Sequence, residues 1–249
     1  MMLLEIENLK KAFGGFRATD GVSLSVVKGS LSSLIGPNGA GKTTLFNQIT
    51  GYLVPDSGRV AFRAEEITGL HPYEISRKGI TRAFQIINIF PRLTVVESVQ
   101  LAILARRGQT LKCFAPAKRM VWGEAMAVLE TVGLAERAET LARELSHGDQ
   151  RVLELALALA GEPELLLLDE PMAGMSPFER TKVTELIQKI HQERGVTVLF
   201  CEHDMDVVFG ISQRVTVLHQ GRVIAEGKPE EIKKNEEVHN VYLGQDASI

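Results

Sequence analysis

One glycine-rich stretch near the N-terminus limits the possible folds more than any other part of the chain. It reads GPNGAGKTT and fits the spacing G-x-x-x-x-G-K-[ST] at every fixed position. Its members are Gly36, Pro37, Asn38, Gly39, Ala40, Gly41, Lys42, Thr43 and Thr44. A short apolar run, 31–35, precedes it, and residues 44–50 follow without a helix breaker. The pattern therefore predicts a strand, a phosphate-binding loop and a helix, in that order.

The chemistry of this loop predicts a nucleotide and a metal ion as ligands. Glycines lack Cβ, so the backbone can curl and direct its N–H groups, together with the helix N-terminus, at phosphate oxygens. Lys42 is expected to reach the β- and γ-phosphates. The Thr43 hydroxyl is expected to bind Mg²⁺, which prefers oxygen ligands. The alternative is a glycine-rich turn that caps an ordinary helix.

Composition narrows the function classes. The chain has 249 residues, of which 45% are hydrophobic and 24% charged, as in ordinary globular proteins. Its net charge is −3 and it has no long Lys/Arg block, so nucleic acid is not predicted as a partner. Cys113 and Cys201 give neither a disulfide framework nor a CxxC pair, which favours a reducing, cytosolic setting.

The sequence shows no segment that would enter a membrane. The apolar runs fall far short of the ~20 residues that span a bilayer, and the first residues lack a signal-peptide pattern. We therefore expect a chain that does not itself cross a membrane.

Strands and helices are predicted in separate blocks, which indicates an α/β fold with a helical insert. The residues from about 85 to 161 are mainly helical in pattern: Thr94 and Glu97 form a capping box, and an amphipathic stretch ends near Gly133. Ser176 and Pro177 begin another helix. The predicted strands are 3–6, 22–27, 31–35, 59–62, 165–168 and 196–201, followed by a β-hairpin over 215–225.

Two carboxylates follow one of the apolar strands. Residues 165–168 are all leucine, as expected for a strand that is covered on both faces, and Asp169 and Glu170 come next. Open α/β sheets bind ligands at the carboxyl ends of their strands. Asp169 is expected to hold Mg²⁺ through water, and Glu170 to orient or deprotonate the attacking water. The alternative is that the two acids only mark where the strand meets solvent.

A histidine has the corresponding place after the next apolar strand. Residues 196–201 are followed by Glu202, His203 and Asp204. Since His203 follows a predicted strand, as Asp169 does, we expect its side chain to contact a phosphate of the nucleotide. A structural role is the alternative for a lone histidine.

Two further features have more than one interpretation. Phe13 is expected at a strand end, where its flat face can stack on adenine; packing in the core is the alternative, and Phe16 is a rival for the role. Ser146 and Asp149 make a second capping box. Taken alone, this segment favours a capped, buried helix over a second phosphate-binding helix N-terminus.

In this order, the motifs resemble those of the nucleotide-binding subunits of ABC-type transporters, and the resemblance covers nearly the whole chain. The segment 36–44 resembles Walker A, LSHGD the signature, LLLLDE Walker B, and AGMS the D-loop. The resemblance implies that Phe13 stacks on adenine, that Gln85 touches Mg²⁺ and faces the membrane partner, that Glu170 is catalytic, and that His203 is the switch histidine.

The resemblance changes the interpretation of the helix that begins at Ser146. In this family two chains pair head to tail, and each signature closes over the ATP of the other chain. It therefore implies that Ser146, His147, Gly148 and Asp149 face the partner's ATP. The commoner signature is LSGGQ and the commoner D-loop ends in Asp, whereas His147, Asp149 and Ser176 stand here. We interpret these departures as variants that tune the rate, although Asp149 brings negative charge near a phosphate.

The implied fold is a P-loop NTPase core of the ABC type, with an antiparallel β subdomain and a helical insert. A single ATP-binding domain over 1–249 would place the core and β subdomain in 1–84 and 162–249, and the helical subdomain in 85–161. Among ABC proteins the branched-chain amino acid importers are most alike, with urea and amide importers next. The segments behind this include TRAFQIINIFPRLTVVESV, DEPMAGMSP, CEHDMDVVFG and VTVLHQGRVIAEGKPEEI.

The resemblance also implies cofactors, partners and a location. ATP and Mg²⁺ would be the cofactors, and ATP hydrolysis would drive transport. The implied partners are a second ATP-binding subunit, identical or different, transmembrane permease subunits that meet the chain near residues 85–93, and indirectly a substrate-binding protein. The chain would lie on the cytoplasmic face of the inner or plasma membrane.

Three rival functions share parts of this pattern. One is an exporter motor of the same fold, for example for a lipid. Another is an ABC protein of DNA repair or translation, but such proteins carry long coiled-coil inserts or tandem ATP domains, and this chain has one P-loop and a short insert. The third is a P-loop kinase or simple NTPase, which does not require LSHGD.

Overall fold

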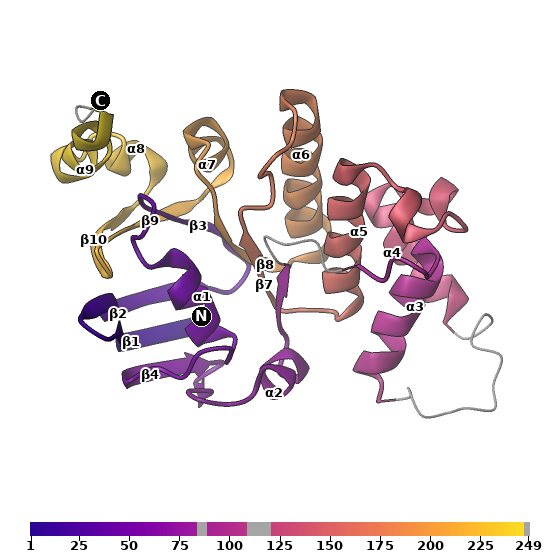
Figure 1. Cartoon of the computed structure of the whole chain (residues 1–249), viewed down its shortest axis with the longest axis horizontal. Helices are drawn as coiled ribbons and strands as arrows, with labels where there is room; N and C mark the ends of the chain where they lie inside the picture. Colours follow the sequence, from indigo (N-terminus) through magenta and orange to yellow (C-terminus); the bar gives the residue numbers. More distant parts are fainter. Residues whose placement is uncertain (84–88, 109–120, 247–249) are drawn as a thin grey trace.

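The structure, a computed structural model, describes residues 1–83, 89–108 and 121–246 (Figure 1). Its strands are β1 (Met2–Phe13), β2 (Phe16–Val27), β3 (Leu31–Ile35), β4 (Ser57–Phe62), β5 (Glu65–Glu66), β6 (Ile80–Ala83), β7 (Leu165–Asp169), β8 (Thr197–Cys201), β9 (Arg214–His219) and β10 (Arg222–Gly227). Its helices are α1 (Lys42–Ile49), α2 (Pro72–Arg77), α3 (Val95–Arg106), α4 (Trp122–Val132), α5 (His147–Ala160), α6 (Pro177–Arg194), α7 (Met205–Ile211), α8 (Pro229–Ile232) and α9 (Glu236–Asp246), with the short 3-10 helices η2 (Ala135–Arg137) and η3 (Ala142–Glu144).

The strands form a mixed sheet and an antiparallel sheet. The first has six strands in the order β10-β9-β3-β8-β7-β6, and its neighbours are parallel from β9 to β6, with β10 antiparallel at one edge. The second has four antiparallel strands in the order β2-β1-β4-β5. The predicted α/β core with an antiparallel β part is therefore confirmed.

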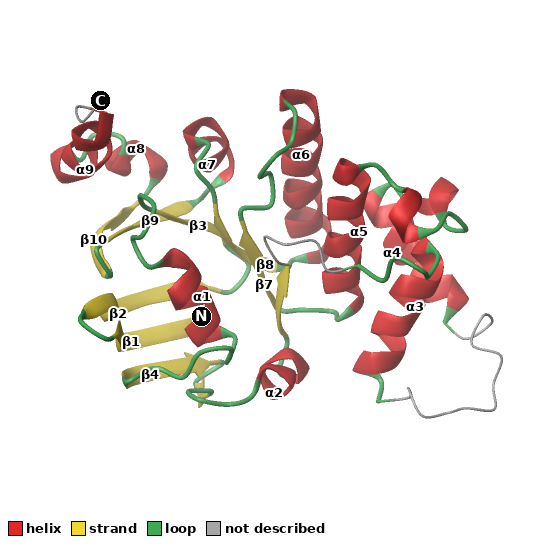
Figure 2. Cartoon of the chain, in the orientation of Figure 1, coloured by secondary structure: helices red, strands yellow, loops and turns green. Residues whose placement is uncertain are grey.

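The central strands β3, β8 and β7 of the six-stranded sheet are buried on both faces. Along β7, Leu165 and Leu167 pack into the core shared with α1 and the antiparallel sheet, whereas Leu166 and Leu168 pack into the core shared with the helices on the other side. This alternation follows from the two-residue period of a strand. Helices α3, α4 and α5 contact one another and gather at the end of the molecule away from β1, β2 and β4 (Figure 2). They are the helical insert that the sequence predicts.

The helix boundaries follow their capping residues. Thr94 Oγ1 accepts a hydrogen bond from the Glu97 backbone N–H, and the Glu97 carboxylate accepts one from the Thr94 N–H, so the first predicted capping box is formed. Gly133 ends α4 and Gly195 ends α6 with φ values of 76° and 63°, a left-handed conformation that glycine adopts without strain. Within the described part of the chain, no helix has both the length and the apolar character needed to span a bilayer.

The predictions miss some elements and boundaries. Strands β1 and β2 extend well beyond the predicted 3–6 and 22–27, because register shifts interrupt their alternation without ending their pairing. The pattern predicts neither α2 nor β6, which have six and four residues and are too short to show a period. The helix after the glycine loop begins at Lys42, two residues before the predicted start at 44.

Candidate functional site

The candidate site lies where adjacent parallel strands end. The glycine loop follows β3, Glu202 and His203 follow β8, and Asp169 and Glu170 stand at the end of β7. These strands are neighbours in the order β3-β8-β7, and Asp169 is paired in register with Cys201. The sheet order therefore brings segments that are far apart in the sequence to one edge, where open α/β sheets bind ligands.

The glycine loop needs two of its glycines for backbone packing. A Cβ on Gly36 would lie 2.1 Å from the Leu218 carbonyl oxygen, and a Cβ on Gly41 would lie 2.1 Å from the Ala18 carbonyl oxygen. Gly41 also caps α1 with a φ of 105°. Gly39 has a φ of 78° and no neighbouring atom within 4 Å of an added Cβ, so this part of the loop faces open space. The loop is thus held tightly on one side and exposed on the other.

Lys42 lies within the curl of this loop. Its Nζ donates hydrogen bonds to the carbonyl oxygens of Gly36, at 2.6 Å, and Pro37, at 3.2 Å. Burial lowers the pKa of the Lys42 ammonium, while the carboxylates of Glu170 and Asp169 act in the opposite direction. The cation is therefore held close to the place where phosphates are expected.

Asp169 is held by a buried arginine from the next strand. Arg82, in β6, donates from Nη2 to Asp169 Oδ2 at 2.5 Å and from Nη1 to Asn47 Oδ1, in α1, at 2.6 Å. The two side chains of the ion pair are only 6% and 2% exposed. Arg82 therefore links the predicted metal ligand to the helix that follows the glycine loop.

Replacing Arg82 with Met is expected to lower the free energy of unfolding by about 3–5 kcal/mol, because it leaves the buried Asp169 charge without its cation. Urea denaturation without nucleotide measures this. The control is Arg214→Met, which removes an arginine that is half exposed and bound to Glu226, and should cost about 1 kcal/mol or less. Equal costs for the two variants would contradict the importance of the buried pair.

Glu170 and His203 meet at this edge, as their parallel positions in the sequence suggest. His203 Nε2 lies 3.0 Å from Glu170 Oε1. Glu170 has a φ of 51°, an uncommon conformation for a residue other than glycine. Its backbone N–H donates to the Cys201 carbonyl oxygen at 3.0 Å, which fixes the start of this turn against β8.

The segment 146–149 begins α5, in the helical part of the molecule. Ser146 Oγ accepts a hydrogen bond from the Asp149 N–H at 3.2 Å, but the Asp149 carboxylate pairs with Arg137 at 3.0 Å, so the second predicted capping box is only half formed. A Cβ on Gly148 would lie 2.6 Å from the Glu179 carboxylate, at the start of α6. Among the residues that the structure describes, no hydrogen bond or ion pair joins 146–149 to the glycine loop of the same chain.

The other predicted site residues have different positions. Phe13 and Phe16 face each other across the β1–β2 hairpin and are 52% and 58% exposed, so neither packs in the core. His147 is exposed at the start of α5. Gln85 lies outside the described residues.

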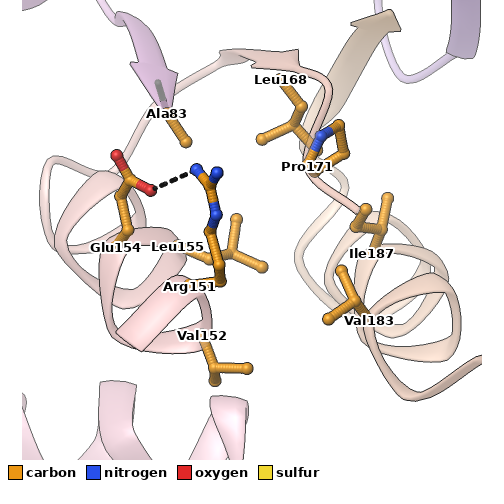
Figure 3. A pocket seen from close by; sticks show the side chains of 9 residues that line it. All are labelled: Ala83, Arg151, Val152, Glu154, Leu155, Leu168, Pro171, Val183 and Ile187. Atoms are coloured by element: carbon orange, nitrogen blue, oxygen red, sulfur yellow. Dashed lines mark hydrogen bonds and ion pairs between the residues drawn. The ribbon is translucent and has the colours of Figure 1, made fainter. Parts of the chain in front are cut away.

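A small cavity lies between α5, the end of β7 and α6, and it is too small for a nucleotide. Arg151 and Glu154 from α5 face Leu168, Val183 and Ile187 across it (Figure 3). Its volume of about 20 Å³ is enough for about one water molecule, whereas small-molecule sites measure roughly 300–1,000 Å³. The residues predicted to bind the nucleotide lie elsewhere, at the edge of the sheet where β3, β8 and β7 end.

Three charged residues near the predicted site escape the sequence analysis. Arg82 binds Asp169, Arg137 binds Asp149, and Glu202 accepts backbone hydrogen bonds from Met172 and His203. Burial raises the pKa of Glu202, while its two N–H donors lower it. The position of Arg82 within TRAFQ, three residues before Gln85, is the one signal that could have indicated it.

The mixed sheet, the glycine loop after β3 and the acids after β7 together define a P-loop nucleotide-binding domain. A family model described as "ABC transporter" matches residues 19–173, more than half of the chain. A second, described as "Branched-chain amino acid ATP-binding cassette transporter", matches residues 222–248. The chain therefore belongs to the ABC transporter family, as the resemblance in its motifs implies.

Curated and solved proteins agree with this family. The chain is 41% identical to the "High-affinity branched-chain amino acid transport ATP-binding protein LivG" of Salmonella typhimurium, over 98% of each chain. A nucleotide-free ATP-binding cassette from an ABC transporter superposes with a TM-score of 0.86 at 35% identity, over 97% of this chain and 99% of that one. A dimeric cassette, MJ0796 bound to ADP and Pi, superposes with a TM-score of 0.77 at 27% identity, over 91% and 99%.

Proposed function

We propose that this chain is the ATP-hydrolysing subunit of an ABC importer for branched-chain or related amino acids. The observation that carries the substrate class is the 41% identity, over nearly the full length of both chains, to a protein named for branched-chain amino acid transport. The C-terminal match at 222–248 supports the same class. The contact between Glu170 and His203 at the open edge of the sheet supports hydrolysis.

ATP and Mg²⁺ fit the residues at this edge. Thr43 and Asp169 supply oxygen donors, the type that Mg²⁺ prefers, and Mg²⁺ usually combines one or two protein ligands with phosphate oxygens and water. When bound, Mg²⁺ would neutralise charge on the β- and γ-phosphates.

Each of the predicted site residues would then have a separate role in hydrolysis. The glycine loop, 36–44, would hold the phosphates through its N–H groups, with Lys42 on the β- and γ-phosphates. Glu170 would accept a proton from the attacking water, or orient that water in line with the γ-phosphate. His203, which contacts Glu170, would donate a hydrogen bond to the γ-phosphate. Gln85, outside the described residues, is proposed beside the metal ion.

A second ATP-binding subunit would complete each site. Because LSHGD resembles the family signature, which closes over the nucleotide of the other chain, we assign Ser146, His147, Gly148 and Asp149 to the partner's nucleotide. The cassette bound to ADP and Pi is dimeric, which supports this arrangement. The Arg137–Asp149 pair would offset the negative charge of Asp149 near that phosphate.

Permease subunits would meet the chain beside residues 85–93. In the described part of this segment, the Phe90 side chain is 45% exposed, so it is available for a contact with another subunit. We place the chain on the cytoplasmic face of the membrane, as a peripheral subunit that receives substrate only indirectly, through a binding protein and the permease. We also propose 85–161 as the helical subdomain that moves against the core in 1–84 and 162–249.

Replacing Phe13 with Ala is expected to weaken ATP binding about 5- to 150-fold, because stacking of a base on an aromatic ring contributes about 1–3 kcal/mol. Fluorescence titration with a labelled ATP analogue measures the dissociation constant. Phe16→Ala, on the paired strand, is the matched control and should change it by less than about twofold. If Phe16→Ala weakened ATP binding and Phe13→Ala did not, Phe16 would be the residue that stacks on adenine.

Uptake by the source organism tests the proposed function. Cells whose chromosomal copy carries Glu170→Gln should lose high-affinity uptake of labelled leucine, isoleucine and valine, and should keep uptake of urea and amides. The control is Glu164→Gln, at the other end of β7. Loss of urea or amide uptake alone would favour those importers, and a defect in lipid export with normal uptake would favour an exporter.

A further inference from the structure

Glu202 is a buried carboxylate that the proposed reaction does not use. It directly follows β8 and is 5% exposed. A carboxylate that leaves water is stabilised only if hydrogen bonds or cations replace its hydration. Its partners therefore indicate what it does.

Both partners of Glu202 are backbone groups beside the candidate site. Oε1 accepts a hydrogen bond from the Met172 N–H at 2.9 Å, and Oε2 accepts one from the His203 N–H at 3.1 Å. Met172 belongs to the turn after β7, and His203 to the loop after β8. One carboxylate thus bridges the two loops that carry Glu170 and His203.

The turn at Glu170 needs such support. A residue other than glycine at a φ of 51° costs free energy and persists only where its surroundings hold it. The Glu170 N–H is bound to the Cys201 carbonyl oxygen, and two residues later the Met172 N–H is bound to Glu202. Cys201, at the end of β8, and Glu202, which follows it, therefore hold this turn at Glu170 and two residues after it.

We propose that Glu202 is a positioning residue that holds the turn after β7 and the loop after β8 in register, so that Glu170 and His203 stay within hydrogen-bond distance. This inference rests on the proposed function, because it gives Glu202 a role in the same hydrolysis reaction. Because both of its oxygens accept hydrogen bonds from backbone N–H groups, we assign Glu202 no contact with the nucleotide or the attacking water.

Glu202→Gln tests this role with little change in volume. An amide has one acceptor oxygen and an NH₂ group, so it can accept from only one of the two N–H donors and faces the other with a donor. We expect kcat for ATP hydrolysis by the full chain to fall about 10- to 100-fold, as for a small misplacement of reacting groups. The KM for ATP should stay within about twofold, because the glycine loop is unchanged.

The matched control is Glu231→Gln. Glu231 also accepts a backbone hydrogen bond, from the Lys228 N–H at 2.8 Å, but it does so in α8, away from the site. This variant should keep both kcat and KM. A Glu202→Gln enzyme with an unchanged kcat, or with kcat and KM altered together, would overturn the proposal.

A double-mutant cycle separates positioning from general destabilisation. If Glu202 acts through His203 and Glu170, Glu202→Gln should reduce kcat by less than about twofold further in a His203→Ala background, because coupled residues are not additive. If Glu202→Gln lowered kcat in the His203→Ala background as much as in the wild-type background, Glu202 would not act through His203.

Histidine NMR tests the geometry without hydrolysis. In the nucleotide-free full chain, the imidazole signals of His203, assigned with His203→Ala, should shift in Glu202→Gln in the same direction as in Glu170→Gln, and should not shift in Glu231→Gln. Unchanged signals in Glu202→Gln would overturn the positioning role. If the wild-type chain hydrolyses no ATP, the proposed function fails, and this spectrum still decides whether Glu202 holds the contact.

Discussion

Glu170→Gln is expected to reduce ATP hydrolysis about 100- to 10,000-fold, because a glutamine cannot accept the proton of the attacking water. Its amide also replaces the carboxylate that lies 3.0 Å from His203 Nε2. Release of phosphate from ATP, measured with saturating Mg²⁺, gives the rate. ATP binding should remain, since Lys42 and the glycine loop are unchanged.

The matched control removes a carboxylate from the other end of the same strand. Glu164 precedes β7 and forms ion pairs with Lys28 and Arg63. Glu164→Gln should hydrolyse ATP at nearly the wild-type rate. If Glu170→Gln kept a tenth or more of that rate, Glu170 would not be the general base.

Ser146→Arg is expected to abolish ATP-dependent dimerisation, and with it hydrolysis. The substitution places a long cationic side chain at the start of α5, on the surface that we assign to the partner's nucleotide. The test uses the Glu170→Gln background, in which bound ATP should hold the dimer together. Light scattering with size-exclusion chromatography measures the mass with and without ATP, for the chain alone or with its second ATP-binding subunit.

Two controls separate this effect from damage to the helix. Ser146→Ala removes the hydrogen bond from the Asp149 N–H, which should cost about 1 kcal/mol of stability, but it leaves space for a partner. Ala127→Arg adds the same charge at an exposed position of α4. Ala127→Arg should form the ATP-dependent dimer as the unsubstituted chain does. Ser146→Ala should also form it, but at a higher ATP concentration, because it loses one contact with the partner's nucleotide. A Ser146→Arg chain that dimerises like the controls would argue against closure of one signature over the other chain's ATP.

The site segments could be predicted from sequence because each has a local pattern. The glycine loop has fixed spacing, and Asp169, Glu170 and His203 each follow an apolar run that ends a strand. The fold class followed from the same runs and from the block of helical pattern between them. In physical terms, these signals depend on residues that are neighbours in the chain.

The contacts that support the site could not be predicted in this way. Arg82 and Asp169 are 87 positions apart, and they meet only because β6 is the neighbour of β7. Met172 and Glu202 are 30 positions apart, and they meet because β7 is the neighbour of β8. Sheet order is a tertiary property that a single sequence does not state.

Asp149 illustrates how such a contact changes an interpretation. From the sequence, its charge opposes a nearby phosphate, and its spacing from Ser146 predicts a capping box. In the structure the Asp149 carboxylate does not bond to the Ser146 N–H. It forms an ion pair with Arg137, a half-exposed side chain in η2. In this chain the charge of Asp149 is therefore offset by a neighbouring cation, and we expect the pair to act as a unit.

Purification of this chain from detergent-treated native membranes, followed by mass spectrometry of the proteins that stay bound, tests the transporter role most directly. We expect hydrophobic permease subunits and a second ATP-binding subunit, with a substrate-binding protein that can then be screened for leucine, isoleucine and valine. Recovery of ribosomes or DNA-repair proteins, with no permease, would contradict that role and favour an ABC protein that works away from the membrane.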